Sequence, residues 1–330
     1  MSVAKYGEVI IVATAEHVKN LIKAHLEHDN ERFKTVVLQI AAYEAKHGHD
    51  TFARELKQYA EKVGSSKDSI LRLNSPNEML AMTIPADRLS DLIVSKETSE
   101  RIARILTEYR NRNKLLKYGF SNRRKILIEG QPGTGKTFTA SVIASELDLP
   151  LYTVQMDKVV TKFMGETSTK LRQIFDSVAA NTGVYFFDEF DAIGADRSLD
   201  NEVGEARRIL NSFLQFIEQD SSESIIIAAT NNQRILDQAL FRRFDDVLHY
   251  TMPTFEEIQR LFELKLNIYD KHFSVTVQLI EKATGLSHAE IIRVCDDAIK
   301  ISILTNTGLS DTQIMKLLDE RIAAYTTKEA

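Results

Sequence analysis

The chain has 330 residues, about twice the usual size of one domain, so two or three modules are expected. Charged residues make up 27% and hydrophobic residues 43%, which argues against wholesale disorder, a collagen-like repeat or a coiled-coil rod. With 42 Lys and Arg against 47 Asp and Glu, the net charge is −5, so no overall positive field recruits nucleic acid or an anionic membrane.

Cysteine content and apolar runs bear on the cellular compartment. Cys295 is the single cysteine, so no intramolecular disulfide can form, which fits a reducing, cytoplasmic setting. The longest uninterrupted apolar runs, such as residues 9–13 and 225–229, have five residues. A membrane span needs roughly 18. We therefore expect a cytoplasmic protein with no membrane partner.

The N-terminal part shows a helical pattern of apolar residues. They recur at helical spacing between residues 15 and 63, and polar breaks at 28–30 and 47–50 divide the pattern into three short amphipathic helices. We predict a small helical bundle over residues 1–75 that serves as an adaptor or docking domain. Polar turn-forming residues follow it, and we assign residues 76–88 to a linker.

A strongly basic stretch begins within the next predicted helix, which covers residues 96–118. Between Arg101 and Lys125 there are nine basic residues and one acidic residue, Glu108. The more common explanation is a solvated helix face whose cations pair with acidic neighbours. The alternative is a local nucleic-acid patch.

A glycine-rich loop lies between a predicted strand and a predicted helix. Residues 130–137 have the sequence Gly-Gln-Pro-Gly-Thr-Gly-Lys-Thr, which is the P-loop pattern G-x-x-x-x-G-K-T in its required context. Glycines let backbone N–H groups turn inward around phosphates, Lys136 supplies charge to the β- and γ-phosphates, and Thr137 is a magnesium ligand. The predicted cofactors are ATP and Mg²⁺. The predicted binding residues are Gly130, Pro132, Gly133, Thr134, Gly135, Lys136, Thr137 and Phe138.

Two carboxylates follow a second predicted strand, residues 184–187. Asp188 and Glu189 come directly after it. Because ligands bind at the carboxyl ends of parallel strands, both side chains are expected beside the P-loop. We predict that Asp188 contributes to the magnesium site through the ion's outer shell, and that Glu189 orients or deprotonates an attacking water.

A third predicted strand, residues 224–230, ends in Asn231. An amide at a strand end can bridge a γ-phosphate and a water, although a strand-end asparagine is more often a turn former. Farther along, Arg242 and Arg243 are adjacent, just past a short predicted helix. Two arginines alone most often form surface ion pairs, but their place in this series makes them catalytic candidates.

Taken together, these motifs resemble the AAA ATPases over residues 89–301. The resemblance implies an α/β fold, with a P-loop NTPase parallel sheet flanked by helices over residues 89–252 and a C-terminal helical lid over residues 253–330. It implies that Asn231 is the polar sensor, and that Arg242 and Arg243 are fingers reaching the nucleotide of a neighbouring subunit. The two arginines are adjacent here, without the usual intervening residues. A closed homo-oligomeric ring, most often a hexamer, is also implied.

The resemblance assigns three further positions. Ile93 lies in a segment similar to one whose backbone contacts adenine, and Ala289 lies in a lid motif near the adenine, where His288 takes the place of the usual glycine. Lid helices are predicted over residues 255–268, 275–283, 287–305 and 311–325. Phe163, Met164 and Gly165 match the aromatic–apolar–glycine triplet of a pore loop that grips a client. Alternatively, Phe163 and Met164 are buried and close a helix.

The favoured hypothesis is a ring ATPase that remodels, unfolds or threads a protein client. The domain layout resembles bacterial ATPases that work with a subtilisin-like serine protease, including pairs in antiphage defence, so such a protease is a candidate partner. One alternative is a nucleic-acid motor or loader, which only the basic stretch encourages, so we do not expect nucleic acid as the partner. A nucleotide-gated scaffold with little hydrolysis is opposed by Glu189, Asn231 and the paired arginines.

Overall fold

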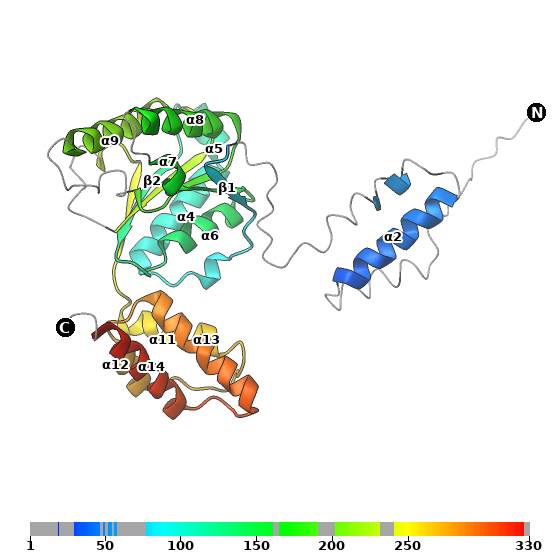
Figure 1. Ribbon diagram of the computed structural model, residues 1–330, viewed down its shortest axis with the longest axis vertical. Helices are drawn as coiled ribbons and strands as arrows, with labels where there is room; N and C mark the ends of the chain where they lie inside the picture. The colour runs from blue at the N-terminus through cyan, green and yellow to red at the C-terminus, as the bar shows by residue number, and fades with distance from the viewer. Residues whose placement is uncertain are drawn as a thin grey trace, which may run out of the picture. The chain divides into compact units, whose positions relative to one another are not determined.

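The computed structural model describes residues 19, 30–46, 49, 52–54, 56–57, 77–160, 165–190, 202–231 and 241–326 (Figure 1). The chain divides into two compact units, Met1–Leu71 and Arg72–Ala330. In the first unit, α2 (Asn30–Lys46) corresponds to the second predicted helix of the bundle. It buries Val36, Val37 and Ile40, at the spacing of an amphipathic helix. Apart from a few residues, the first and third predicted helices lie outside the described residues.

The second unit contains a six-stranded sheet, the helices that cover it and a separate group of helices after it. Its elements in chain order are β1 (Leu80–Thr83), η1 (Leu89–Asp91), α4 (Lys96–Arg110), α5 (Arg112–Lys117), β2 (Lys125–Gly130), α6 (Lys136–Glu146), β3 (Leu151–Val154), α7 (Met156–Val159), α8 (Glu166–Ala180), β4 (Val184–Phe187), α9 (Glu202–Gln219), β5 (Ile225–Thr230), β6 (Asp246–Tyr250), α11 (Phe255–Leu266), α12 (Val277–Ala283), α13 (His288–Thr305) and α14 (Asp311–Thr326).

The sheet is parallel except at one edge. Its strand order is β1-β3-β4-β5-β2-β6, and only β1 runs antiparallel to its neighbour, β3. The register pairs Phe187 of β4 with Ala228 of β5, and Glu129 of β2 with Thr230 of β5. The carboxyl ends of β2, β4 and β5 therefore meet at one edge, and this α/β fold confirms the predicted fold class.

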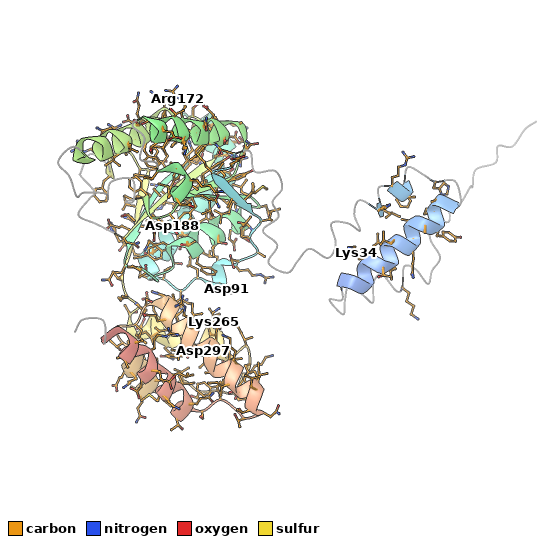
Figure 2. All side chains as sticks on the ribbon, in the orientation of Figure 1. Lys34, Asp91, Arg172, Asp188, Lys265 and Asp297 are labelled. Carbon is orange, nitrogen blue, oxygen red and sulfur yellow. The ribbon has the colours of Figure 1, made fainter. Side chains whose placement is uncertain are left out.

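Alternating side chains of the sheet build two apolar layers. Leu127 of β2 packs into the layer beneath α8 and α9, whereas Ile126 and Ile128 pack into the layer that α4 and α6 cover. Figure 1 shows these helix pairs on opposite faces of the sheet. Arg172 of α8, which Figure 2 labels, contacts Phe216 of α9. Its guanidinium lies 5.5 Å from the centroid of the Phe216 ring. The α/β part of the second unit thus has three layers, with the sheet in the middle.

Two local expectations differ from the structure. Strand β1 lies inside the segment assigned to a linker, where it forms the antiparallel edge of the sheet. The helix predicted over residues 96–118 is divided at Asn111, whose side-chain amide donates to the carbonyl oxygen of Thr107 at 2.8 Å. An asparagine side chain that bonds the local backbone competes with helix continuation, which accounts for the break.

The basic stretch is extensively paired with acidic side chains. Arg101 lies 3.0 Å from Asp246, and Arg110 lies 3.1 Å from Glu146. Three further cations of the stretch have partners: Arg112 pairs with Glu223, Arg123 with Glu108, and Arg124 with Asp220. These contacts favour the structural explanation of the stretch over a nucleic-acid patch.

The lid is formed by α11, α12, α13 and α14, each within two residues of a predicted helix. Capping boxes begin two of them, with Thr254 and Glu257 at α11, and Ser287 and Glu290 at α13. Ile93, from the segment that precedes α4, packs into the apolar core of these helices. Within the described ranges, no helix has both the length and the apolar character required to cross a bilayer.

Candidate nucleotide-binding site

The P-loop adopts a conformation that its glycines permit. Gly133 and Gly135 have φ values of 76° and 103°, in the region that side chains with a Cβ rarely adopt. Gly135 is the N-cap residue of α6, and its carbonyl oxygen accepts a hydrogen bond from Thr139 Oγ1 at 3.0 Å. Thr139 also bonds the hydroxyl of Tyr250 on β6, and burial raises the pKa of Tyr250 above its usual value. The loop is therefore anchored to the neighbouring strand, at a helix N-terminus that favours anions.

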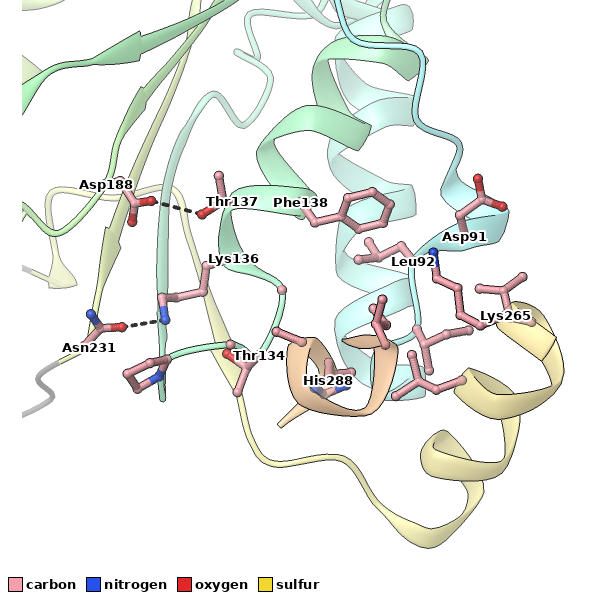
Figure 3. A pocket seen from close by; sticks show the side chains of 18 of the residues that line it. Asp91, Leu92, Thr134, Lys136, Thr137, Phe138, Asp188, Asn231, Lys265 and His288 are labelled. Atoms are coloured by element: carbon pink, nitrogen blue, oxygen red, sulfur yellow. Dashed lines mark hydrogen bonds between the residues drawn. The ribbon is translucent and has the colours of Figure 1, made fainter. Parts of the chain in front are cut away.

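Lys136, the first residue of α6, has three acceptors within hydrogen-bonding distance of its ammonium group. Its Nζ lies 2.9 Å from the carbonyl oxygens of Gly130 and Gln131, and 2.7 Å from Oδ1 of Asn231. The side chain is 7% exposed. The residue predicted as the polar sensor is thus in direct contact with the P-loop lysine (Figure 3).

A hydroxyl and two carboxylates lie together at the carboxyl ends of the strands. Thr137 Oγ1 donates to Asp188 Oδ2 at 3.0 Å, and the backbone N–H of Glu189 donates to Asp188 Oδ1 at 2.9 Å. Glu189 has a φ of 48°, which is uncommon for a residue with a Cβ. Strained backbone of this kind is concentrated at functional sites, where the surrounding structure holds it.

The lid contacts the P-loop through the first turn of α13. The backbone N–H of Ala289 donates to the carbonyl oxygen of Gly133 at 3.0 Å. A Cβ added at Gly133 would lie 2.5 Å from Ser287 Oγ, the N-cap hydroxyl of α13. A side chain at Gly133 would therefore push this turn of the lid away, so glycine is required here for close approach as well as for its φ.

A cavity of about 480 Å³ lies between the P-loop, η1 and the lid (Figure 3). At one end it is lined by the P-loop, Asp188, Glu189 and Asn231. Its remaining walls come from residues 91–93 and from α11 and α13. The lining residues predicted from the sequence are Ile93, Pro132, Gly133, Thr134, Gly135, Lys136, Thr137, Phe138, Asp188, Glu189, Asn231 and Ala289.

The two predicted arginine fingers do not line this cavity. Arg242 is exposed, and Arg243 forms an ion pair with Glu218 of α9. In the predicted pore loop, Phe163 and Met164 lie outside the described residues. Gly165 is exposed at the N-cap of α8 with a φ of 81°, and a Cβ added there would meet no atom of the described residues within 4 Å.

Several cavity residues were not predicted as ligands from the sequence. Leu261, Leu264 and Lys265 recur at intervals of three and four on α11, and His288 and Ile292 are four apart on α13. This spacing places each set on one helix face. The helical pattern alone could have grouped these residues, but only the docking of the lid shows that the faces line the cavity.

Lys136→Ala is expected to abolish measurable ATP binding. The substitution removes the one ammonium group of the described P-loop, which we assign to the phosphates, and releases Asn231 from its 2.7 Å contact. Because charge-assisted hydrogen bonds to a buried site are worth roughly 1.5–3 kcal/mol each, affinity should fall by more than about 100-fold. Titration with a fluorescent ATP analogue measures this. Retained affinity within about threefold of wild type would contradict the assignment.

The chain is similar to known proteins over more than the residues of this site. The family described as "ATPase family associated with various cellular activities (AAA)" matches residues 126–252. An uncharacterized AAA family ATPase, y4kL, of Sinorhizobium fredii is 33% identical over 301 residues, which cover 89% of this chain and 90% of that protein. The similarity therefore includes residues on both sides of the matched family region.

Longer relatives share only part of their length with this chain. An ATP-dependent zinc metalloprotease FtsH of Mycoplasmopsis synoviae is 31% identical over 73% of this chain and 37% of its own. A putative 26S proteasome regulatory subunit homologue of Methanocaldococcus jannaschii is 27% identical over 72% of this chain and 66% of its own. With the P-loop fold and near full-length similarity in hand, we conclude that the chain belongs to the AAA family of ATPases and hydrolyses ATP.

Proposed function

We propose that copies of this chain assemble into a ring, a hexamer as is most common in the family. The ring is a magnesium-dependent motor that uses ATP hydrolysis to remodel, unfold or thread a protein client. One observation supports the ring most strongly. The cavity gathers the P-loop, Asp188, Glu189 and Asn231, whereas Arg242 and Arg243 lie outside it. If either arginine acts on a nucleotide, the nucleotide lies in another copy of the chain. Such a contact joins different surfaces of two copies, and repeated with rotation it closes a ring.

Within this proposal, the triphosphate lies along the P-loop. Backbone N–H groups at Gly133 and Gly135 and the Lys136 ammonium bind the phosphates, while the cavity beyond Phe138 accommodates the nucleoside. Thr137 Oγ1 is a hard oxygen donor of the kind that Mg²⁺ prefers, and Asp188 Oδ2, 3.0 Å away, would act on the ion through its outer shell. Bound there, Mg²⁺ would neutralise charge on the phosphates.

Hydrolysis also needs a positioned water, and two residues are proposed to hold it. Glu189 extends from the turn after β4 and is exposed at the cavity, so its carboxylate can accept a proton from water. Asn231, fixed by its contact with Lys136, can orient the same water with its amide. As fingers, Arg242 and Arg243 of the neighbouring copy complete the neutralisation of charge on the phosphates.

The proposal of a protein client rests on the relatives and on the sequence. The names of two relatives refer to a protease and to a proteasome regulatory subunit, and the pore-loop triplet lies before α8. Among the described residues, no group of three or more His, Cys, Asp or Glu is placed to hold a metal ion. In its narrower form, which rests only on the resemblance of the domain layout, the proposal adds a separate subtilisin-like serine protease of an antiphage system as the partner.

ATPase activity at graded protein concentration tests the ring. A shared site predicts that specific activity rises with concentration in parallel with assembly, measured by light scattering on the same samples. Constant specific activity down to concentrations at which only single copies remain would contradict the proposal. DNA and RNA binding, measured at graded salt, tests the alternative motor, and binding that falls steeply with salt would favour it.

Phe163→Ala is expected to lower client remodelling by about tenfold or more and ATP hydrolysis by much less. Loss of the phenyl side chain removes an apolar contact with the polypeptide. For a phenyl group this costs roughly 1.5 kcal/mol or more of binding free energy. The measurement is unfolding of an unstable fluorescent protein in parallel with phosphate release. Equal losses in both assays would support the alternative that Phe163 is a core residue.

A further inference from the structure

The lid contributes a largely apolar wall to the cavity. Leu261, Leu264, Ala289 and Ile292 line it, and Lys265 and His288 are the titratable side chains that the described lid residues add. In ligand sites of this type, apolar walls contribute contact area and a few polar groups fix orientation and specificity. Figure 3 places Lys265 beside Asp91 and Leu92, and His288 at the first turn of α13, nearer the P-loop.

His288 is buried without a hydrogen-bond partner. The residue is 6% exposed, and neither Nδ1 nor Nε2 has a partner among the described residues. Such groups are rare in folded proteins, because each unsatisfied polar atom carries a desolvation penalty. A structural histidine would be expected to bond a backbone or side-chain atom, so this ring requires another explanation.

The backbone that carries this ring is held in place. His288 is the first residue of α13, between the capping box of Ser287 and Glu290 and the hydrogen bond from Ala289 to Gly133. The nearby Glu257 carboxylate already accepts from the backbone N–H of Thr254 in the capping box of α11. His288 therefore lies at the junction of lid and P-loop, among the residues that line the cavity.

The protonation state suits recognition of a neutral ring. Burial lowers the pKa of His288 below its usual value, and the carboxylate of Glu257 opposes this shift. A neutral imidazole has one N–H donor and one lone-pair acceptor. The edges of adenine carry an amino donor and ring-nitrogen acceptors, so either imidazole nitrogen has a complementary atom there.

We propose that His288 hydrogen-bonds an edge of the adenine ring and thereby sets the preference of this ATPase for adenine among nucleoside triphosphates. The proposal rests on the proposed placement of ATP in this cavity. It also accounts for histidine where glycine is usual in the resembling motif, since a glycine has no side-chain group to contact a base.

The test compares His288→Leu and His288→Gln with wild type in the full-length chain. The substrates are ATP, GTP, 7-deaza-ATP and purine riboside triphosphate, which lacks the 6-amino group. We expect His288→Leu to lower kcat/KM for ATP by about 5- to 100-fold and for GTP by less than about twofold. His288→Gln, which keeps a donor and an acceptor, should recover part of the loss. One of the two adenine analogues should lower wild-type kcat/KM to a similar extent but have no further effect in His288→Leu.

Thermal unfolding without nucleotide separates this role from a structural one. Because leucine has no polar atoms to leave unpaired, His288→Leu should be at least as stable as wild type, while its stabilisation by ATP should shrink. Asp296→Ala, an exposed position of α13 outside the cavity, is the control and should change none of these ratios.

An equal loss of kcat/KM for all four substrates in His288→Leu, or unchanged kcat/KM for ATP, would overturn the proposal. Failure of the proposed ATP site itself has a different signature. In that case Lys136→Ala would retain ATP binding, whatever the behaviour of His288 variants.

Discussion

Replacing both Arg242 and Arg243 by alanine is expected to lower kcat for ATP hydrolysis by about 10³- to 10⁵-fold, the range measured for arginine fingers. ATP affinity should change by less than about threefold, because neither side chain lines the cavity of its own chain. Steady-state phosphate release gives kcat, and titration with a fluorescent ATP analogue gives the affinity. This split between turnover and binding follows from a group that reaches the nucleotide only from outside.

The single variants should separate the two arginines. Arg243 is held by Glu218 of α9, whereas Arg242 is exposed without an ion-pair partner among the described residues. The variant with the larger loss in kcat identifies the finger. Arg112→Ala removes an arginine that is paired on the surface with Glu223, and it should leave kcat within about twofold. If the double variant retains kcat within about threefold of wild type, neither arginine acts in catalysis.

Glu189→Gln is expected to lower kcat by about 10²- to 10⁴-fold while ATP still binds and stabilises the protein. Glutamine keeps the size and hydrogen-bonding reach of the side chain but cannot take up the proton of an attacking water. Single-turnover hydrolysis and the thermal shift with ATP measure the two parts of this expectation. Normal turnover in Glu189→Gln would show that another group is the base.

The backbone at Glu189 allows a matched pair of variants that separates catalysis from strain. Its φ of 48° is costly for any residue with a Cβ and free of cost for glycine. Glu189→Gly should therefore be more stable than Glu189→Ala by about 1 kcal/mol, although both lose turnover equally. Equal stability of the two variants would mean that the turn relaxes and stores no strain.

Long periodic helices and the P-loop could be predicted from local sequence. The lid helices α11, α12, α13 and α14 lie within two residues of their predicted bounds, because apolar spacing and capping residues mark helices directly. Strands β2, β4 and β5 were found because central strands of a parallel sheet are continuous apolar runs.

The other three strands could not be found in this way. β1 and β3 each contain a threonine, and β6 contains Asp246 and His249, so none of them is a continuous apolar run. Strands β1 and β6 form the two edges of the sheet, and β3 pairs with β1. Such segments adopt strand conformation through hydrogen bonds to distant neighbours, which local periodicity does not record.

The residues of the candidate site likewise differ in whether the sequence predicts their position. The P-loop, Asp188, Glu189 and Asn231 follow strand ends, so the parallel sheet alone predicts that they meet. Lys265 and His288 reach the cavity only because the first turn of α13 docks on Gly133, a contact between residues more than 150 positions apart. The resemblance of the lid motif placed Ala289 and His288 near the adenine, but the position of Lys265 and the unpaired ring of His288 become visible only in three dimensions.

Mixing two inactive variants tests the central claim most directly, namely that the site is completed by an arginine from a neighbouring copy. Subunits with Arg242→Ala and Arg243→Ala keep an intact cavity, and subunits with Glu189→Gln keep intact arginines. With random assembly, about a quarter of the sites at equal mixing combine both intact parts, so ATPase activity should appear and peak near that ratio. Absence of activity at every ratio, in samples where light scattering shows that the variants assemble together, would contradict a shared site.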